Sequence, residues 1–153
     1  ALKLDPVSRL TTWNLAIMLN IVGQAQEARV HLENLIEREE NAFGRNAARL
    51  APYLNDYAGT MIALEDYEAA KKIGVRALEL DKAAFGMDHL YVARDLSNLA
   101  VILSKLGDNQ NAAQYQSQAI DVFTQRCGPD HELTRFARKG QFIPSMCIRM
   151  NVE

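Results

Sequence analysis

The sequence predicts an all-α protein made of a helical repeat, and two observations carry this prediction. The first is a constant spacing: Gly44, Gly86 and Gly128 lie 86−44 = 42 and 128−86 = 42 residues apart. The second is the helix period, since apolar residues within each repeat recur at i, i+3, i+4 and i+7. No stretch of useful length alternates apolar and polar residues as a half-buried strand does. The chain is therefore expected to form stacked helices.

The same 42-residue offset relates small and apolar residues along the repeat. It relates Ala16, Ala58 and Ala100; Ala28, Ala70 and Ala112; Leu19, Met61 and Leu103; and Leu35, Ala77 and Ala119. A small residue at one point of each helix lets two helix backbones approach closely, and larger apolar residues fill the space beside it. One helix pair cannot bury its own apolar face, so we expect the pairs to stack into a solenoid.

Each unit is predicted to contain two helices joined by a short turn. Asp5 and Pro6 supply the start of the first helix, as an N-cap carboxylate and a proline in the first turn. Each second helix ends just before a repeated glycine, and Gly128 suits the left-handed position that often follows a helix. We expect units at about 3–44, 45–86 and 87–128, a capping helix within 129–140 and a C-terminal tail at 141–153.

These residues resemble the tetratricopeptide repeat, a two-helix unit marked by a small residue and two later alanines. The third unit shows the pattern as Ala100, Ala112 and Ala119. The 42-residue length and the run Gly86-Met87-Asp88-His89-Leu90 are similar to the repeats of kinesin light chains. The resemblance covers roughly residues 6–138 and implies a right-handed α-solenoid of three helix pairs plus a C-terminal capping helix. His89 and His131 are related by the repeat, so we expect them to cap or pack at helix starts.

In such a solenoid the first helix of each pair lines the concave side, where a partner segment binds. The candidate peptide-binding residues lie between the core positions of these helices: Trp13, Asn14, Ile17, Asn55, Asp56, Arg94, Ser97, Asn98, Val101 and Lys105. An asparagine amide donates and accepts, so it pairs with both polar groups of a peptide bond. The resemblance implies this contact for Asn14 and Asn98.

Five of these candidates have a second interpretation. Asn14 and Asn98 are otherwise simply solvated helix positions. Trp13 offers either a binding contact, since aromatic residues are enriched at hot spots, or core packing. Arg94 and Lys105 are candidates to bind a ligand carboxylate, and otherwise are solvated helix positions. The sequence alone leaves these alternatives open.

Charge and residue patterns argue against other classes of function. The formal net charge is −2, with 17 basic and 19 acidic residues, so nucleic-acid binding is not expected. No uncharged apolar run approaches the ~20 residues that cross a bilayer, so no membrane partner is expected. Phosphate loops, zinc-ligand spacings and Ser-His-Asp signatures are missing from the sequence, and we predict no enzyme activity, no cofactor and no metal. Cys127 and His131 are poorly placed, across a helix end, for nucleophilic catalysis.

The chain has two cysteines, Cys127 and Cys147, too few for the disulfide framework of a small secreted domain. We expect two free thiols in a reducing compartment and a cytoplasmic location. The first residue is Ala1 rather than methionine, which favours a fragment of a longer protein.

The C-terminal tail is apolar without a clean period. We expect it to dock on the solenoid, because so apolar a segment is costly to leave in water; binding to a partner chain and disorder are the alternatives. The predicted function is a scaffold or adaptor that binds a protein or peptide ligand in the groove. Two alternatives stay open: a sensor or oligomerisation arm of a larger signalling protein, such as a nucleotide-dependent switch, and a structural repeat that forms a homo-oligomer through the tail.

Overall fold

The computed structural model describes residues 6–149, and every regular element within that range is a helix. The α-helices are α1 (Pro6–Ile21), α2 (Ala25–Phe43), α3 (Ala51–Ala63), α4 (Tyr67–Phe85), α5 (Leu90–Lys105), α6 (Asn109–Cys127), α7 (Glu132–Arg138) and α8 (Ser145–Arg149). A 3₁₀ turn, η1 (Ala48–Leu50), precedes α3. The predicted all-α class is confirmed.

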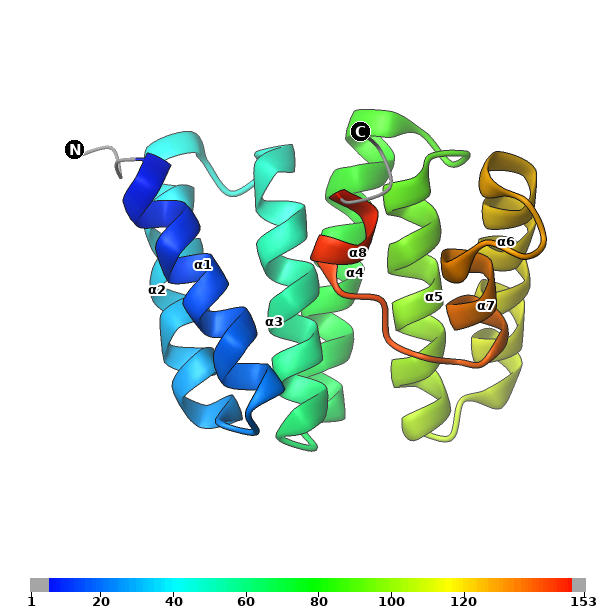
Figure 1. Cartoon of the computed structure of the whole chain (residues 1–153), viewed down its shortest axis with the longest axis horizontal. Coiled ribbons are helices and arrows are strands. Elements are labelled where there is room, and N and C mark those ends of the chain that lie inside the picture. Colours follow the sequence, from blue (N-terminus) through cyan, green and yellow to red (C-terminus); the bar gives the residue numbers. More distant parts are fainter. Residues whose placement is uncertain (1–5, 150–153) are drawn as a thin grey trace.

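The helices form an α-solenoid of three antiparallel pairs. Each helix from α1 to α7 packs against the next along the chain. The first helices α1, α3 and α5 make one layer, and the second helices α2, α4 and α6 make the other (Figure 1). The short helix α7 covers α6 at the C-terminal end, where the sequence predicts a cap.

The repeat spacing is visible in the helix boundaries. The second helices begin at Ala25, Tyr67 and Asn109, separated by 67−25 = 42 and 109−67 = 42 residues, and each has 19 residues. The alanines that the sequence assigns to close helix contacts are buried: Ala16, Ala28, Ala58, Ala70, Ala77, Ala100, Ala112 and Ala119. Side chains this small leave room for neighbouring backbones to approach, which is the physical basis of the stacking.

The glycines that follow the second helices are required by backbone conformation. Gly86 has φ 79° and ψ 172°, and Gly128 has φ 99° and ψ 161°. The positive φ agrees with the expectation for Gly128, but the ψ value is extended rather than left-handed helical. This region is open essentially only to glycine, because a Cβ would clash with the backbone there.

The first helix of the second unit starts later than its register predicts. Its first turn, Ala48–Leu50, is a 3₁₀ turn, and the α-helix begins only at Ala51. Pro52 lies at the start of this helix and has no N–H with which to continue an i→i−4 ladder. The chain therefore enters α3 through the tighter turn.

Histidines cap two of the helices, as the sequence predicts. His89 Nδ1 accepts a hydrogen bond from the Tyr91 N–H at 3.2 Å. His131 Nδ1 accepts one from the Leu133 N–H, also at 3.2 Å. Each side chain satisfies one of the unpaired N–H groups that every helix start leaves. The predicted cap Asp5 lies outside the described residues.

Helix α1 presents apolar side chains to solvent at the N-terminal end of the solenoid. Leu15 and Met18 are 43% and 55% exposed. They lie two repeats before Leu99 and Ile102, since 99−15 = 84 and 102−18 = 84. Leu99 and Ile102 are buried where α5 packs on Gly74 of α4. The exposed face of α1 is thus apolar at the positions that, two repeats later, are buried by the stacking of helix pairs.

We expect Gly86→Ala to lower the free energy of unfolding by about 1–3 kcal/mol, because the added Cβ forces an L-residue into a glycine-only conformation. The space around this position is open, so crowding adds nothing to the effect. Chemical denaturation measures the change. The exposed neighbour Met87 provides the control: Met87→Ala should shift stability by no more than ~0.5 kcal/mol. Equal stability of Gly86→Ala and the unmodified chain would contradict the conformational requirement.

Candidate peptide-binding groove

The C-terminal tail turns back and lies across the first helices. After α7 the chain runs past α5 toward α3, and α8 lies against α3 (Figure 1). Ile143 and Ile148 are both fully buried in the core that the helices form. The predicted docking of the tail is therefore confirmed for residues 141–149, and residues 150–153 lie outside the described part of the chain.

Asn98, on the inner side of α5, binds both polar groups of one tail residue. Its Oδ1 accepts a hydrogen bond from the Ile143 N–H at 2.7 Å. Its Nδ2 donates to the Ile143 carbonyl oxygen at 2.8 Å and to Asn55 Oδ1 on α3 at 2.7 Å. Both amide hydrogens are thereby used. The structure thus places Asn98 against a peptide backbone, that of the chain's own tail.

Residues of α3 bind the next part of the tail. Asn55 Nδ2 lies 3.2 Å from the Ile143 carbonyl oxygen and 3.1 Å from Ser145 Oγ. Asp56 Oδ1 accepts from the Ser145 N–H at 2.9 Å. The Ser145 hydroxyl donates to the Pro52 carbonyl oxygen at 2.8 Å. Backbone and side-chain groups of the tail therefore find partners on a single helix.

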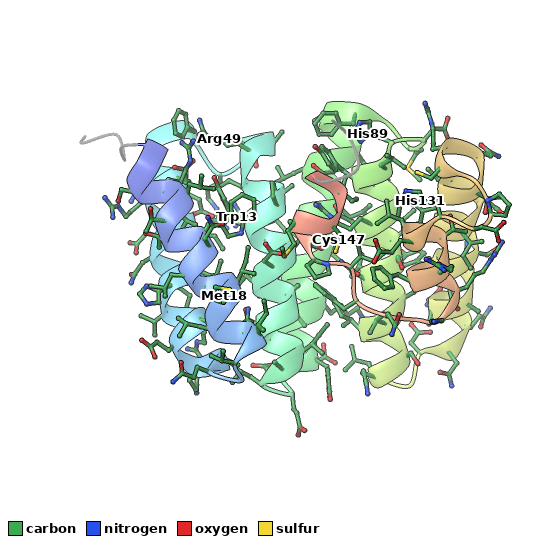
Figure 2. The ribbon with its side chains drawn as sticks, viewed as in Figure 1. Trp13, Met18, Arg49, His89, His131 and Cys147 are labelled. Atoms are coloured by element: carbon green, nitrogen blue, oxygen red, sulfur yellow. The ribbon has the colours of Figure 1, made fainter. Side chains whose placement is uncertain are left out.

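Trp13 connects α1 to this network while packing in the core. It is 5% exposed and meets the Tyr53 ring edge-on, with ring centroids 4.7 Å apart. Figure 2 shows it between α1 and α3. Its indole N–H donates to Asp56 Oδ2 at 2.8 Å. Burial raises the pKa of Asp56, while hydrogen bonds from Ser145 and Trp13 and the charge of Arg94 lower it in part. Trp13 thus supports the groove through Asp56.

The proposed role of Arg94 in binding a ligand carboxylate is wrong, because two carboxylates of the chain already surround it. Arg94 is 1% exposed. Its guanidinium lies 2.7 Å from Asp95 Oδ1 and 3.0 Å from Asp81 Oδ2. A third contact, at 3.4 Å, reaches the Ser145 hydroxyl. Arg94 is thus a buried, neutralised group beneath the tail.

A glycine makes room for an aromatic side chain of the tail. A Cβ on Gly59 would lie 2.8 Å from Cε1 and 2.9 Å from Cζ of Phe142. The matching positions of the first and third units are Ile17 and Val101, since 59−17 = 42 and 101−59 = 42. Only the second unit therefore leaves this place on its first helix empty, and the Phe142 ring occupies it.

The other predicted residues lie around the docked tail. Asn14 is exposed on α1, one repeat before Asp56. Ile17 lines a cavity of about 250 Å³ beside Phe142. Ser97, Val101 and Lys105 line a pocket of about 400 Å³ between α5, α6 and α7. The structure thus brings four of the ten predicted residues, Asn55, Asp56, Arg94 and Asn98, into hydrogen-bond contact with the tail, and the rest lie around them.

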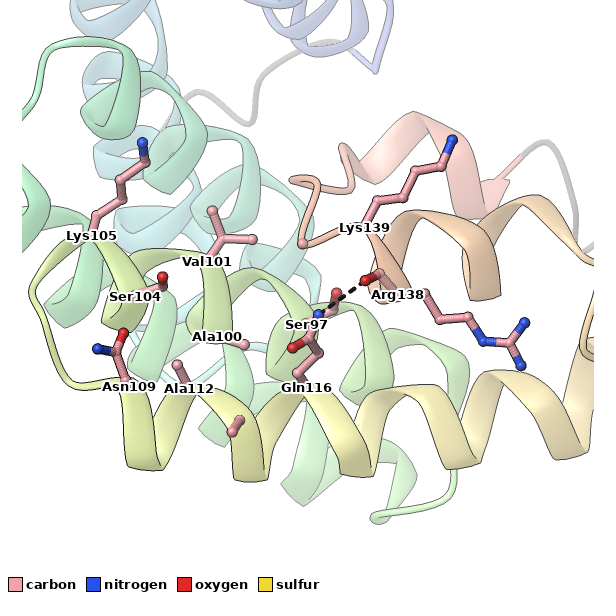
Figure 3. A pocket seen from close by; sticks show the side chains of 12 residues that line it. Ser97, Ala100, Val101, Ser104, Lys105, Asn109, Ala112, Gln116, Arg138 and Lys139 are labelled. Carbon is pink, nitrogen blue, oxygen red and sulfur yellow. Dashed lines mark hydrogen bonds between the residues drawn. The ribbon is translucent and has the colours of Figure 1, made fainter.

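The pocket between α5, α6 and α7 lies beside the tail and stays open (Figure 3). Lys105 and Lys139 stand at its rim, and Gly140 closes it at the point where the tail begins. Gln116 donates to the Ala137 carbonyl oxygen at 2.8 Å and joins α6 to α7 along one wall. The basic groups at its entrance suit an acidic or carbonyl-rich segment.

Three residues that shape the groove have no role predicted from the sequence. Asp81 lies on a second helix, Ser145 lies in a segment without period, and Gly59 has no side chain with which to bind a ligand. Gly59 did carry a signal, because a glycine inside a helix costs about 1 kcal/mol relative to alanine and usually has a packing reason. No comparable signal marked Asp81 or Ser145.

Both thiols are free and partly buried. Burial raises the pKa of Cys127 and of Cys147, which disfavours the reactive thiolate. Within residues 6–149, three or more His, Cys, Asp or Glu side chains never gather in a metal-binding group. None of the helices in that range has the length and apolar character of a membrane span.

The fold and the site define a class: solenoids of antiparallel helix pairs with a groove along their first helices. The sequence profile described as Tetratricopeptide repeat matches residues 8–83 and again residues 50–125. The chain belongs to the tetratricopeptide repeat family. Such repeats are generally protein–protein interaction modules and typically non-enzymatic scaffolds.

The fold is also similar to the crystal structure of BtubC (BKLC) from P. vanneervenii. The TM-score is 0.75 at 18% sequence identity, and the match covers 92% of this chain and 59% of that chain. The chain thus spans less than two thirds of its structural neighbour. The predicted tetratricopeptide repeat is thus confirmed by the sequence profile, and the likeness to this structure shows the same fold.

The buried charges around Arg94 give the stability a pH dependence. Burial, followed by repulsion from Asp95, raises the pKa of Asp81 from 3.8 to about 8. The folded state therefore holds this proton more tightly than the unfolded state. Its contribution to stability is complete below about pH 4 and is lost as the pH rises through about 8.

We expect Asp81→Asn to reduce but not abolish the fall in unfolding free energy between about pH 5 and pH 9, because burial also raises the pKa of Asp56 and of Asp95. The amide keeps an acceptor for Arg94 but does not titrate. Urea denaturation across this pH range measures the slope. Asp88, which is exposed, supplies the control Asp88→Asn. A slope unchanged by Asp81→Asn would contradict the assignment.

We expect Gly59→Val to release the tail, because the added side chain fills the space of the Phe142 ring. The Ile143 amide should then exchange its hydrogen at least tenfold faster, since it loses Asn98 as acceptor, while the amides of α5 and α6 remain protected. Hydrogen exchange followed by NMR measures both. Ala84→Val, at an exposed position on α4, adds a branched side chain away from the tail and should leave Ile143 protected. Unchanged protection in Gly59→Val would show that the ring is not needed for docking.

Proposed function

We propose that the groove along α3 and α5 binds an extended segment of a partner protein, and that the protein acts as a scaffold or adaptor. The observation that carries the proposal is the pairing of Asn98 with both the N–H and the carbonyl oxygen of Ile143. This contact recognises the backbone of a peptide and does not involve the side chain of the bound residue. It suits any extended segment that can replace the tail.

The side-chain amide of Asn98 is held in place before a ligand binds. Asn55 Oδ1 accepts from Asn98 Nδ2 at 2.7 Å, which fixes the orientation of the amide. Both asparagines lie on helices whose opposite faces are buried in the core. Such pre-organisation lowers the ordering cost of binding, because the groove need not rearrange to receive the segment.

The open pocket at the α5–α7 end gives a partner a place to bind first. It adjoins the tail at Gly140 and displays Lys105 and Lys139. A partner segment with an acidic residue ahead of its groove-binding part can occupy it while the tail is still docked. Lys105 therefore keeps its predicted role as a ligand contact, and Asn14, exposed on α1, extends the lining toward the N-terminal end.

The two alternative functions, a sensor arm of a larger signalling protein and a self-associating structural repeat, stay predictions. The peptide-binding function is preferred because the groove residues already hold a peptide segment.

The test selects random peptides against the full chain carrying Phe142→Ala, which weakens the resident tail. We expect selected peptides to lose at least tenfold in affinity on the further change Asn98→Ala, because two hydrogen bonds to the peptide bond disappear; each costs about 1 kcal/mol or more when its partner is left unpaired. Fluorescence anisotropy measures the dissociation constants.

Asn34→Ala, at an exposed position on α2, is the matched control and should not change the affinity. Asn98→Asp is a second variant of nearly the same shape that keeps an acceptor but cannot donate to the carbonyl oxygen. It separates lost binding from lost folding, provided the thermal unfolding midpoint is retained. Peptides that bind both Asn98 variants as tightly as the parent, or a library that yields no binder, would overturn the proposal.

A further inference from the structure

We infer that residues 142–145 are a resident ligand, and that partner segments for this groove carry the same order of side chains: an aromatic residue, a branched aliphatic residue, proline, and a small residue with a hydroxyl group. The inference rests on the proposed function and names the ligand class for it. Four neighbouring features of the groove, one for each tail residue, carry it.

The first feature is the recess above Gly59, which takes the ring of Phe142. The contact is close, since two ring atoms lie only 2.8 and 2.9 Å from where the first carbon of any side chain would be. A flat ring enters such a recess more readily than a branched chain, because it is thin in one direction. The recess continues into the cavity of about 250 Å³ lined by Ile17 and Ile21, so that an aromatic residue larger than phenylalanine also has room.

The second feature recognises the aliphatic residue through both its backbone and its side chain. Asn98 binds its backbone, as described above, and the Ile143 side chain is fully buried in a core cluster to which α3, α4, α5, α6 and α7 all contribute. Burial of a side chain of this size contributes about 1.5–3 kcal/mol. A polar residue at this position would keep the backbone contact but lose the burial.

The third feature explains the proline. Pro144 has no N–H, so the absence of an acceptor for it in the groove costs nothing. It also disfavours the helical conformation for the residue before it. Ile143 is thereby held extended, the conformation in which its N–H and carbonyl oxygen both face Asn98. The proline thus pre-orders the segment for the contact that carries the binding.

The fourth feature selects a small hydroxyl residue. Ser145 is 2% exposed, donates its hydroxyl to Pro52 at 2.8 Å and accepts from Asn55 at 3.1 Å. Its N–H donates to Asp56 at 2.9 Å. An alanine here would leave the Pro52 carbonyl oxygen and Asn55 without these partners, and a large side chain would not fit.

The polar character of the contact between the tail and the groove distinguishes the tail, as a ligand, from α7, which is a structural cap. Helix α7 covers the end of the solenoid with the fully buried Leu133 and Ala137. The tail also buries Ile143 and Ile148, but it adds hydrogen bonds from groove side chains to its backbone and hydroxyl, which water satisfies when the tail leaves. Because the tail is tethered, its effective concentration is on the order of millimolar, so modest affinity keeps it docked and a partner with the same pattern displaces it.

The test uses a labelled peptide of residues 141–149 with serine in place of Cys147. We expect it to bind the full chain carrying Phe142→Ala at least tenfold more tightly than the unmodified chain, in which the resident tail competes. In the peptide, alanine at the position of Phe142, Ile143 or Ser145 should each weaken binding at least fivefold. Alanine at the position of Met146, whose side chain is exposed, should change it less than twofold. Fluorescence anisotropy gives each dissociation constant.

The outcomes separate this inference from the proposed function. Random peptides that bind through Asn98 without this pattern, together with a tail peptide that fails to bind the Phe142→Ala chain, would overturn the resident-ligand inference and leave the proposed function standing. Failure of both peptides would overturn both. Dimers that exchange tails between copies, seen by sedimentation, would support the inference, because the segment would then bind in trans.

Discussion

The pairing of Asn98 with the N–H and the carbonyl oxygen of Ile143 is the contact on which the rest of the groove depends. Its geometry requires α5 to present an amide at one fixed point, and Asn55 on α3 fixes the orientation of that amide. The spacing between α3 and α5 is set in turn by the small residues in the helix contacts, because larger ones would separate the helices. The regular repeat thus serves to hold a few polar atoms at the spacing of an extended peptide.

The architecture was predictable because each unit repeats the same pattern of small and apolar residues in its helix pair. A 42-residue period in small residues fixes the pairing of helices, their layers and the direction of stacking, and one deviation had a local cause, Pro52 at the start of α3. The candidate groove was predictable to the extent that it follows from the helix period. Asn55, Asp56 and Asn98 were placed correctly on the inner face, since register alone decides that position.

The place where the tail docks and the charge network could not be predicted, for the same reason. Ile143 lies 45 positions from Asn98 along the chain, and its segment has no period that would reveal which residues face inward. Arg94 looked available because its register places it in the groove, but Asp95 and, on a different helix, Asp81 already bind its guanidinium. Contacts between an irregular segment and a regular scaffold depend on three-dimensional complementarity, on which a periodic pattern gives no information.

Whether the tail is a cap or a ligand is decided by what its removal would expose. A cap covers apolar surface, so its loss costs hydrophobic free energy in proportion to the area uncovered. The strip beneath residues 142–145 is instead rich in amide and carboxylate groups that water can solvate, while the apolar part of the contact is concentrated in Phe142, Ile143 and Ile148. A segment held by a few apolar anchors and a row of exchangeable hydrogen bonds binds with limited affinity for its length. That balance suits exchange with a partner, because an incoming segment with the same anchors recovers the whole free energy of the contact.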